Sequence, residues 1–239
     1  MRLTISWSGG KDSALALYRI LLEGRHSVAG LHTVINKESH RVGLHGIPEE
    51  MVEEQARSID LPLTKLYLKG RNRHADYVSL LQAYYHQCKM SGIEGVVFGD
   101  IFLEDLKNFR QALLEPFGLI PMFPLWKKDP ELILDNFLAA GFKSLLCSAN
   151  AAYFGEHQMG KTLDINFMNS LPQQVDPCGE NGEFHTFVYD GPLFSYPVAF
   201  EPGQVVRHSY NYKITNNEGI VKDMESSFWF QELFPRIAL

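Results

Sequence analysis

The sequence predicts an α/β protein in which helices cover both faces of a mostly parallel sheet, followed by a smaller α+β region. From residue 1 to about residue 147, short apolar runs alternate with segments of helical periodicity. Such alternation is typical of right-handed crossovers between parallel strands. Further along the chain, turn signals separate β-rich runs. We therefore expect a first domain over residues 1–147 and a second, smaller domain over residues 148–239.

The elements of the first domain follow from the spacing of apolar residues. Short apolar runs predict strands, and apolar residues spaced three and four apart predict helices. Strands are expected at residues 3–7, 28–34, 63–68, 96–98 and 144–148. Helices are expected over residues 14–22, from Pro48 onward, and over residues 75–90, 106–118 and 129–141. The helix starts at Pro48 and at Asp129-Pro130 are supported by the preference of proline for the first helical position.

The second domain is predicted from turn signals. Residues 150–172 have the pattern of a short helical patch. Turns are expected at Asp190-Gly191-Pro192, at Pro202-Gly203 and at Asn216-Asn217-Glu218-Gly219, with β-rich runs between them. Runs of this kind, separated by turns, are typical of antiparallel strands.

The composition excludes some classes of partner. The 239 residues carry a formal net charge of −6, whereas nucleic-acid-binding domains favour a basic face. There is no signal-peptide pattern and no apolar run of about 18 residues, so we expect no membrane partner. The three cysteines, Cys88, Cys147 and Cys178, form no CxxC pair. This favours a reduced, cytoplasmic location, with Cys88 in the core.

The stretch Ser8-Gly9-Gly10-Lys11-Asp12-Ser13 joins the first predicted strand to the first helix. Glycines at such a turn let the backbone approach a ligand closely, and the free N–H groups at a helix start attract anions. Lys11 adds a positive charge, and the two serines add hydroxyl groups. The spacing differs from that of a Walker A loop, which has four residues between its glycines. The stretch is therefore predicted to bind phosphate groups as a loop of another class.

Several motifs together resemble one family. They are SGGKDSALALY at 8–18, His45 with QARSIDLPL at 55–63, FGDI at 98–101, PLW at 124–126, CGENGEFHT at 178–186 and DGPLF at 190–194. In these motifs the chain resembles the diphthine–ammonia ligase (diphthamide synthetase) family of N-type ATP pyrophosphatases. Their phosphate loop, the PP-loop, is shared by many ATP-dependent enzymes. The last two motifs are much more specific to this family. The resemblance implies a Rossmann-like sheet of the HUP type.

The resemblance also implies a reaction. A carboxylate is activated with ATP as an acyl-adenylate, pyrophosphate is released, and ammonia then displaces AMP to give an amide. The expected cofactors are ATP and Mg²⁺. The expected carboxylate substrate is diphthine-like. Such a carboxylate can belong to a side chain of a protein, for example an elongation factor. The resemblance is compatible with a homo-oligomer as well.

The nucleotide contacts are predicted at the carboxyl edge of the sheet, where open α/β sheets bind ligands. The residues are Ser8, Gly9, Gly10, Lys11, Asp12, Ser13, Leu31, Thr33, Gly99 and Asp100, and the resemblance adds His45. The resemblance also implies that Lys11 neutralises charge on the leaving pyrophosphate and that Asp12 approaches Mg²⁺.

Glu180 and Glu183 lie in a polar, glycine-rich stretch that we expect to lie outside the core. One interpretation is that they are exposed carboxylates of a turn. The other is catalytic: the pair, together with Lys11 and Asp12, serves the reaction by binding metal or by positioning and deprotonating ammonia.

Two segments depart from the family pattern. Where the family has Y-Q-R-x-R-x-E, residues 105–111 read DLKNFRQ, with Arg110 shifted by one position. Where the family has G-E-G-G-E-F-E-T, Asn181 replaces a glycine and His185 replaces a glutamate. Lys107, Arg110 and His185 are predicted to face the second substrate, so the identity of the carboxylate stays open.

Other functions use the same loop. A tRNA-modifying enzyme would favour a basic groove or a CxxC sulfur relay, and an ATP pyrophosphatase could act on a small-molecule acid. A nucleotide-binding regulator would not need the carboxylates of the second domain.

Overall fold

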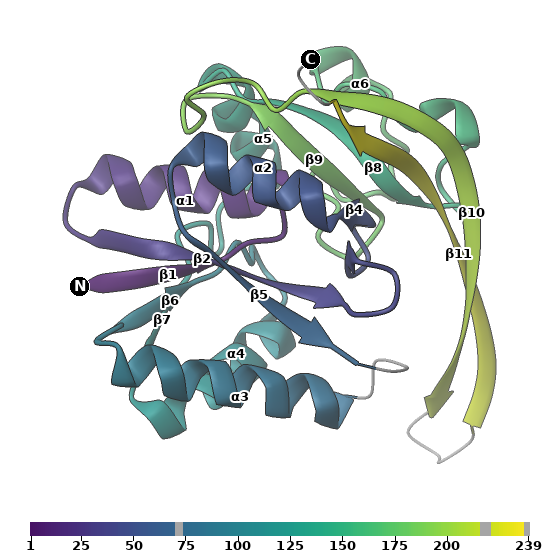
Figure 1. The fold of residues 1–239 in the computed structure, drawn as a ribbon. Coiled ribbons are helices and arrows are strands. Elements are labelled where there is room, and N and C mark those ends of the chain that lie inside the picture. Colours follow the sequence, from purple (N-terminus) through teal and green to yellow (C-terminus); the bar gives the residue numbers. More distant parts are fainter. Residues whose placement is uncertain (70–73, 216–220, 237–239) are drawn as a thin grey trace.

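The computed structural model describes residues 1–69, 74–215 and 221–236 (Figure 1). The turn predicted at residues 216–219 lies outside these ranges. The helices are α1 (Lys11–Glu23), α2 (Glu49–Ile59), α3 (His74–Met90), α4 (Glu104–Leu114), α5 (Pro130–Ala139) and α6 (Ile165–Asn169), with short 3₁₀ helices at Glu115–Phe117 and Glu156–Gln158. Within the described residues, none of the helices has the length and the apolar character that crossing a membrane requires.

The first sheet is the predicted parallel sheet. Its parallel strands are β1 (Arg2–Ser6), β2 (Ser27–Asn36), β5 (Leu63–Leu68), β6 (Gly95–Val97) and β7 (Ile120–Met122). They lie in the order β5-β2-β1-β6-β7, and the short strands β3 (Arg41–Val42) and β4 (Ile47–Pro48) extend the sheet beside the end of β2. Helices α1 and α2 cover one face and α3 and α4 the other (Figure 1). The predicted fold class of this part is confirmed.

Strand β1 lies at the centre of the sheet, which explains why Leu3, Thr4 and Ile5 along it are buried. Leu3, Ile5 and Trp7 are at most 2% exposed, and Thr4 between them is also buried. Central parallel strands are covered on both faces, so they read as continuous apolar runs. The strand brings the loop that follows it to the carboxyl edge of the sheet.

The second sheet is antiparallel and consists of β8 (Lys143–Asn150), β9 (Phe184–Asp190), β10 (Phe200–Thr215) and β11 (Val221–Pro235). Its order is β10-β11-β8-β9. Strand β9 packs against α1, and β11 packs against α2 (Figure 1). The second sheet therefore lies over the same face of the parallel sheet as the helix that follows the glycine-rich loop.

One strand was assigned to the wrong sheet by the sequence pattern. Residues 144–148 form a strand, as predicted, but β8 pairs antiparallel with β9 and β11 instead of extending the parallel sheet. Local periodicity identifies a strand but not its partner, and both partners here come from later in the chain. The division at residues 147 and 148 stays a prediction, and β8 crosses it.

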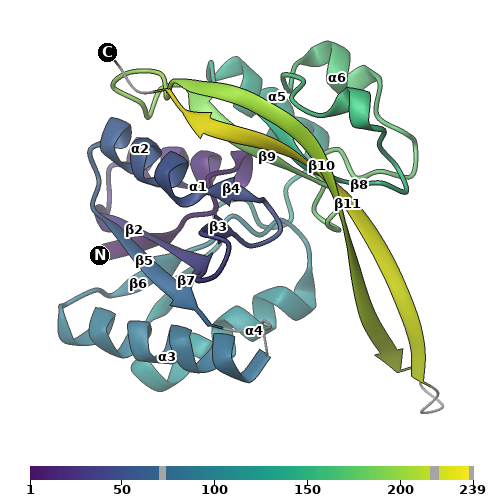
Figure 2. The same ribbon diagram turned by 45° about the vertical axis from the view of Figure 1, so that its right-hand side comes forward.

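The hairpin of β10 and β11 extends beyond the rest of the molecule (Figure 2). The turn expected at Pro202-Gly203 is wrong, because these residues lie inside β10, at a shift in register with β11. The turn expected at Asp190-Gly191-Pro192 is confirmed, since β9 ends at Asp190.

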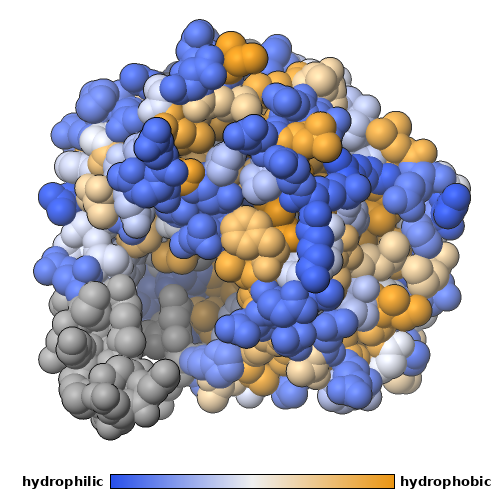
Figure 3. Space-filling view, turned by 180° about the vertical axis from the view of Figure 1, so that it is seen from behind, coloured by the Kyte–Doolittle hydropathy of each residue, from blue (hydrophilic) through white to orange (hydrophobic). Residues whose placement is uncertain are grey.

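Seen from behind, the molecule presents small groups of hydrophobic residues between hydrophilic ones (Figure 3). Such a mixture is common on protein surfaces.

Candidate active site

The glycine-rich loop forms a cradle at the start of α1. Gly10 precedes the first helical residue, Lys11, so the N–H groups of Asp12 and Ser13 in the first turn have no acceptor within the helix. The hydroxyl oxygens of Ser8 and Ser13 are 3.2 Å apart, and Ser13 Oγ donates to the carbonyl oxygen of Gly10 at 2.9 Å. Free N–H groups and the positive end of the helix dipole make such a cradle attractive to anions.

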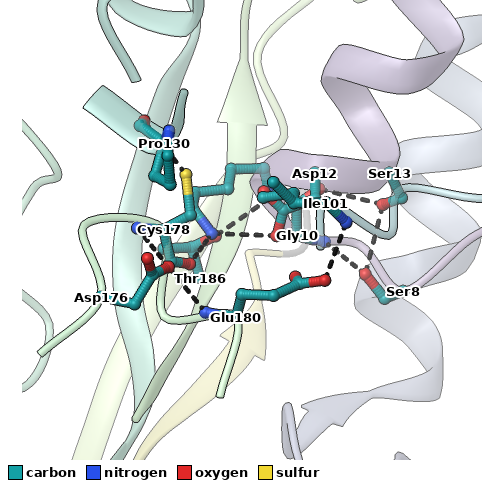
Figure 4. Close-up of polar contacts among 11 residues, drawn as sticks. Ser8, Gly10, Asp12, Ser13, Ile101, Pro130, Asp176, Cys178, Glu180 and Thr186 are labelled. Atoms are coloured by element: carbon teal, nitrogen blue, oxygen red, sulfur yellow. Dashed lines mark hydrogen bonds and ion pairs between the residues drawn. The ribbon is translucent and has the colours of Figure 1, made fainter. Parts of the chain in front are cut away.

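Lys11 joins the loop to the second sheet. Its Nζ donates to Asp12 Oδ2 at 2.9 Å and to the carbonyl oxygen of Cys178, and its backbone N–H donates to Thr186 Oγ1 at 3.0 Å (Figure 4). Burial is the largest single influence on the pKa of Lys11 and lowers it, but the charge of Asp12, its hydrogen bond and the other acidic groups nearby together outweigh burial, so the pKa is raised. A charged ammonium group is therefore held beneath the loop.

Asp12 keeps one oxygen free for a ligand. Burial raises its pKa, although Lys11 opposes this shift. Its Oδ2 is paired with Lys11, whereas Oδ1 is buried and has no hydrogen-bond partner among the described residues. Buried carboxylate oxygens are usually satisfied, so this one suggests a group that the protein itself does not supply.

Two adjoining cavities open at the carboxyl edge of the parallel sheet. The loop cavity, of about 210 Å³, contains Lys11 and Asp12 in its wall. The strand cavity, of about 420 Å³, is lined by residues of β2, β5 and α3. Ser6, Ser8 and Arg110 line both, so the cavities share a wall.

The loop cavity gathers most of the predicted site residues. They are Ser8, Lys11, Asp12, Ser13, His45, Gly99, Asp100, Arg110, Glu180 and His185. Gly9 and Gly10 are buried in the loop itself. Thr33 lines the strand cavity. Leu31 and Lys107 line neither, because Leu31 is buried in the core and Lys107 Nζ lies over the ring of Trp126 at 4.4 Å.

Glu180 comes from the glycine-rich stretch before β9 and contacts the segment that follows β6. Its Oε1 accepts from the backbone N–H of Ile101 at 2.8 Å (Figure 4). Burial raises the pKa of Glu180 to about 7, with the nearby carboxylates of Asp12 and Asp100 adding to the shift. A carboxyl group with this pKa can both accept and return a proton near neutral pH.

His45 and His185 lie together beside the loop. Their ring centroids are 4.4 Å apart, and a Cβ atom on Gly10 would come within 3.1 Å of His45 Nε2. Burial, together with the charge of Lys11, lowers the pKa of His185 to about 4, and burial and His185 itself lower that of His45. Both rings are therefore neutral near pH 7 in the free protein.

Two family models match the chain in succession. The model of the diphthamide synthase N-terminal domain matches residues 1–120, and the model of the diphthamide synthase C-terminal domain matches residues 129–221. The chain belongs to the diphthamide synthase family. The resemblance drawn from the loop and from the motifs at 178–186 and 190–194 is thereby confirmed.

Curated members of the family are similar over most of this chain. Diphthine–ammonia ligase of Danio rerio is 27% identical over 233 residues, which cover 87% of this chain and 90% of the relative. The human enzyme is 26% identical, with 87% and 86% covered. That of Schizosaccharomyces pombe is 27% identical over 84% of this chain, but the match covers only 36% of that longer relative.

In this member of the diphthamide synthase family, Glu183 does not lie where we expected. It is buried, at 4% exposure, and lines neither cavity. Its Oε1 accepts from the backbone N–H of Asp176 at 3.0 Å and from Asn181 Nδ2 at 3.1 Å. The turns at Gly179 and Gly182, both with positive φ, fold the polar stretch back over its own carboxylate. The expectation that this stretch lies outside the core is therefore wrong for Glu183.

Replacing Glu183 with alanine is expected to lower the free energy of unfolding by about 2 kcal/mol, because two donors lose their buried acceptor. Thermal or urea unfolding of the purified variant measures this. Asn181→Ala is the matched control, since it removes one of the two donors from an exposed position. A Glu183→Ala protein as stable as the wild type would show that these two hydrogen bonds to Glu183 do not stabilise the fold.

Two residues that line the cavities, Tyr77 and Thr186, were not predicted from the sequence, and Tyr77 lies beside the predicted residue Arg110. Arg110 Nε lies 3.4 Å from Asp100 Oδ2, its guanidinium lies 4.8 Å from the Phe98 ring centroid, and Nη1 is 3.4 Å from the Tyr77 hydroxyl. Tyr77, on α3, has no local signal that would mark it, and Thr186, on β9, ends the motif at 178–186 but was not predicted to contact the loop. Only the packing of α3 against α4, and of β9 against α1, brings them to the site.

Proposed function

We propose that this chain is an ATP-dependent ligase that converts diphthine to its amide with ammonia, releasing AMP and pyrophosphate. The phosphates of ATP occupy the loop cavity, on residues 8–13, and the adenosine occupies the strand cavity beside Thr33. The observation that carries the proposal is that Glu180, with its pKa raised to about 7, lines the same cavity as Lys11 and Asp12. Membership of the diphthamide synthase family supports it.

The first step is adenylation. An oxygen of the substrate carboxylate attacks the α-phosphorus of ATP, and the bond to the β-phosphate oxygen breaks, so that pyrophosphate leaves. Lys11 and the N–H groups at the start of α1 stabilise the negative charge that collects on the leaving group. Arg110, on the wall shared by both cavities, is suited to hold the incoming carboxylate.

The second step is amidation. Ammonia attacks the acyl carbon, the nitrogen loses a proton, and AMP leaves with the electrons of the C–O bond. Glu180 accepts that proton, because it is the carboxylate of the loop cavity whose pKa is raised to about 7. The base of such a step works best when its pKa lies near the working pH.

Mg²⁺ is a further part of the proposal. No cluster of three or more His, Cys, Asp or Glu side chains in the described part of the chain is arranged to hold a metal ion. Magnesium sites in nucleotide enzymes usually combine one or two carboxylates with phosphate oxygens and water. The free Oδ1 of Asp12 fits that pattern. When bound there, Mg²⁺ would neutralise charge on the phosphates.

The second substrate is proposed to be diphthine on an elongation-factor-like protein. His185, which we had predicted to face this substrate, lies against His45 at the phosphate loop, so Arg110 is the better candidate for that contact. A homo-oligomer and a cytoplasmic location stay predictions. A tRNA-modifying role is less well supported, because the net charge is −6 and all three cysteines are buried.

The products of the reaction test the proposal. The purified protein is incubated with ATP, Mg²⁺, an ammonium salt and an elongation factor that carries diphthine, and nucleotides are separated by chromatography. We expect AMP and pyrophosphate in equal amounts, together with the amide by mass spectrometry. ADP and phosphate without AMP would contradict the assignment to this reaction. AMP formed only with another carboxylic acid would support the adenylation chemistry but show that diphthine is not the substrate.

A further inference from the structure

Gln55, on the inner side of α2, holds the glycine-rich loop from behind. It is fully buried. Its Nε2 donates to the carbonyl oxygen of Gly9 at 2.9 Å and to that of Val188, on β9, at 2.6 Å. Its Oε1 accepts from Trp7 Nε1 at 2.9 Å. One side-chain amide thus connects the end of β1, the loop and the second sheet.

These contacts determine which way one peptide group of the loop points. The Gly9 carbonyl oxygen accepts from Gln55 and also from the backbone N–H of Val188 at 3.0 Å. In a planar trans peptide, this carbonyl and the N–H of Gly10 point in opposite directions. The Gly10 N–H accordingly points toward Ser8, and its nitrogen lies 3.3 Å from Ser8 Oγ. Ser8 lines the loop cavity.

The arrangement also requires glycine at position 9. Its φ is +82°, and a Cβ atom there would come within 2.8 Å of Gln55 Oε1. Glycine permits both orientations of the peptide, so the loop needs an outside contact to select one. If the peptide turned over, a carbonyl oxygen would face the phosphate groups in place of an N–H donor.

We infer that Gln55 is a positioning residue that keeps the Gly9–Gly10 peptide turned with its N–H toward the phosphates. The inference rests on the proposed placement of ATP phosphates on this loop. It predicts that Gln55 contributes to the binding of phosphate groups and not to the binding of adenosine, which occupies the other cavity.

The test compares ligands that do and do not reach the loop. Dissociation constants of Gln55→Leu for pyrophosphate, ATP and adenosine are measured by calorimetry in the presence of Mg²⁺. Pyrophosphate and ATP are expected to bind about tenfold more weakly, the effect of losing one well-placed donor, with adenosine affinity unchanged. Gln55→Glu keeps an acceptor for Trp7 but loses both donated bonds, so it should show the same selective loss.

Ser58→Ala is the matched control, because Ser58 is also buried on α2 and hydrogen-bonds the backbone of Tyr196 without touching the loop. It should leave all three dissociation constants unchanged. Equal weakening of adenosine and pyrophosphate, or unchanged affinities in folded Gln55 variants, would overturn the inference. Wild-type protein that binds neither ATP nor pyrophosphate would instead overturn the proposed function together with the inference.

Discussion

Glu180→Gln is expected to lower the rate of amide formation by about 10²- to 10⁴-fold, the usual contribution of a general base. The amide side chain can still accept from the Ile101 N–H, so the loop should keep its position, but it cannot take a proton from the attacking nitrogen. Pyrophosphate release in the absence of ammonia should therefore continue. The two half-reactions are measured separately, by pyrophosphate release and by mass spectrometry of the amide.

Glu94→Gln is the matched control for this change. Glu94 Oε2 accepts a backbone N–H, that of Arg2, at 2.6 Å, and it precedes β6, at the edge of the sheet opposite the cavities. It should not affect either half-reaction. If Glu180→Gln slows both half-reactions equally, Glu180 acts on the nucleotide and not on ammonia.

The same carboxyl group gives the reaction a pH dependence. Burial raises the pKa of Glu180 to about 7. Below that pH the group is protonated and cannot act as a base, so the amidation rate should rise with pH with a midpoint of about 7. Free ammonia is held constant across the series. Lys11, Asp12 and Asp100 face the same cavity, and Glu180→Gln leaves them in place, so the difference between the two profiles isolates Glu180.

Lys11→Met is expected to reduce AMP formation by about 10²- to 10³-fold, the scale of losing one preorganised donor to developing negative charge. Methionine retains an unbranched side chain in the buried position, but pyrophosphate then leaves without the ammonium group beneath the loop. Adenosine binding should persist, because Lys11 does not line the strand cavity. Rates are expressed per folded molecule, since Asp12 loses its partner and the melting temperature should also fall.

Lys143→Met controls for the loss of an ion pair as such. Lys143 Nζ is 2.8 Å from Asp190 Oδ2, almost the same separation as in the pair of Lys11 and Asp12, but the lysine is exposed and lies outside both cavities. The control should leave AMP formation unchanged. Lys11→Met protein that forms AMP at the wild-type rate would remove Lys11 from the mechanism.

The helices, the strands and the phosphate loop could be predicted because they depend on short-range patterns. Apolar periodicity located β1, β2, β5 and β6 of the parallel sheet but not β7. Glycines followed by Lys11 at a strand–helix junction identified the cradle. The loop cavity contains ten of the residues predicted from these patterns and from the resemblance, among them His45 and Glu180. Their roles stay predictions until the variants are measured.

The loop, the helix that follows it and most of the longer strands and helices could be read from the sequence, because each depends on residues close together in the chain. The short strands β3, β4 and β7 could not. Packing of distant elements places β8 in the antiparallel sheet, and it turns Glu180 toward the cavity while Glu183 is buried. Packing also brings Thr186 and Gln55 to the loop, although they lie 175 and 46 residues along the chain from the loop residues that they contact. Such contacts depend on how whole elements pack, and no local pattern of residues specifies that packing.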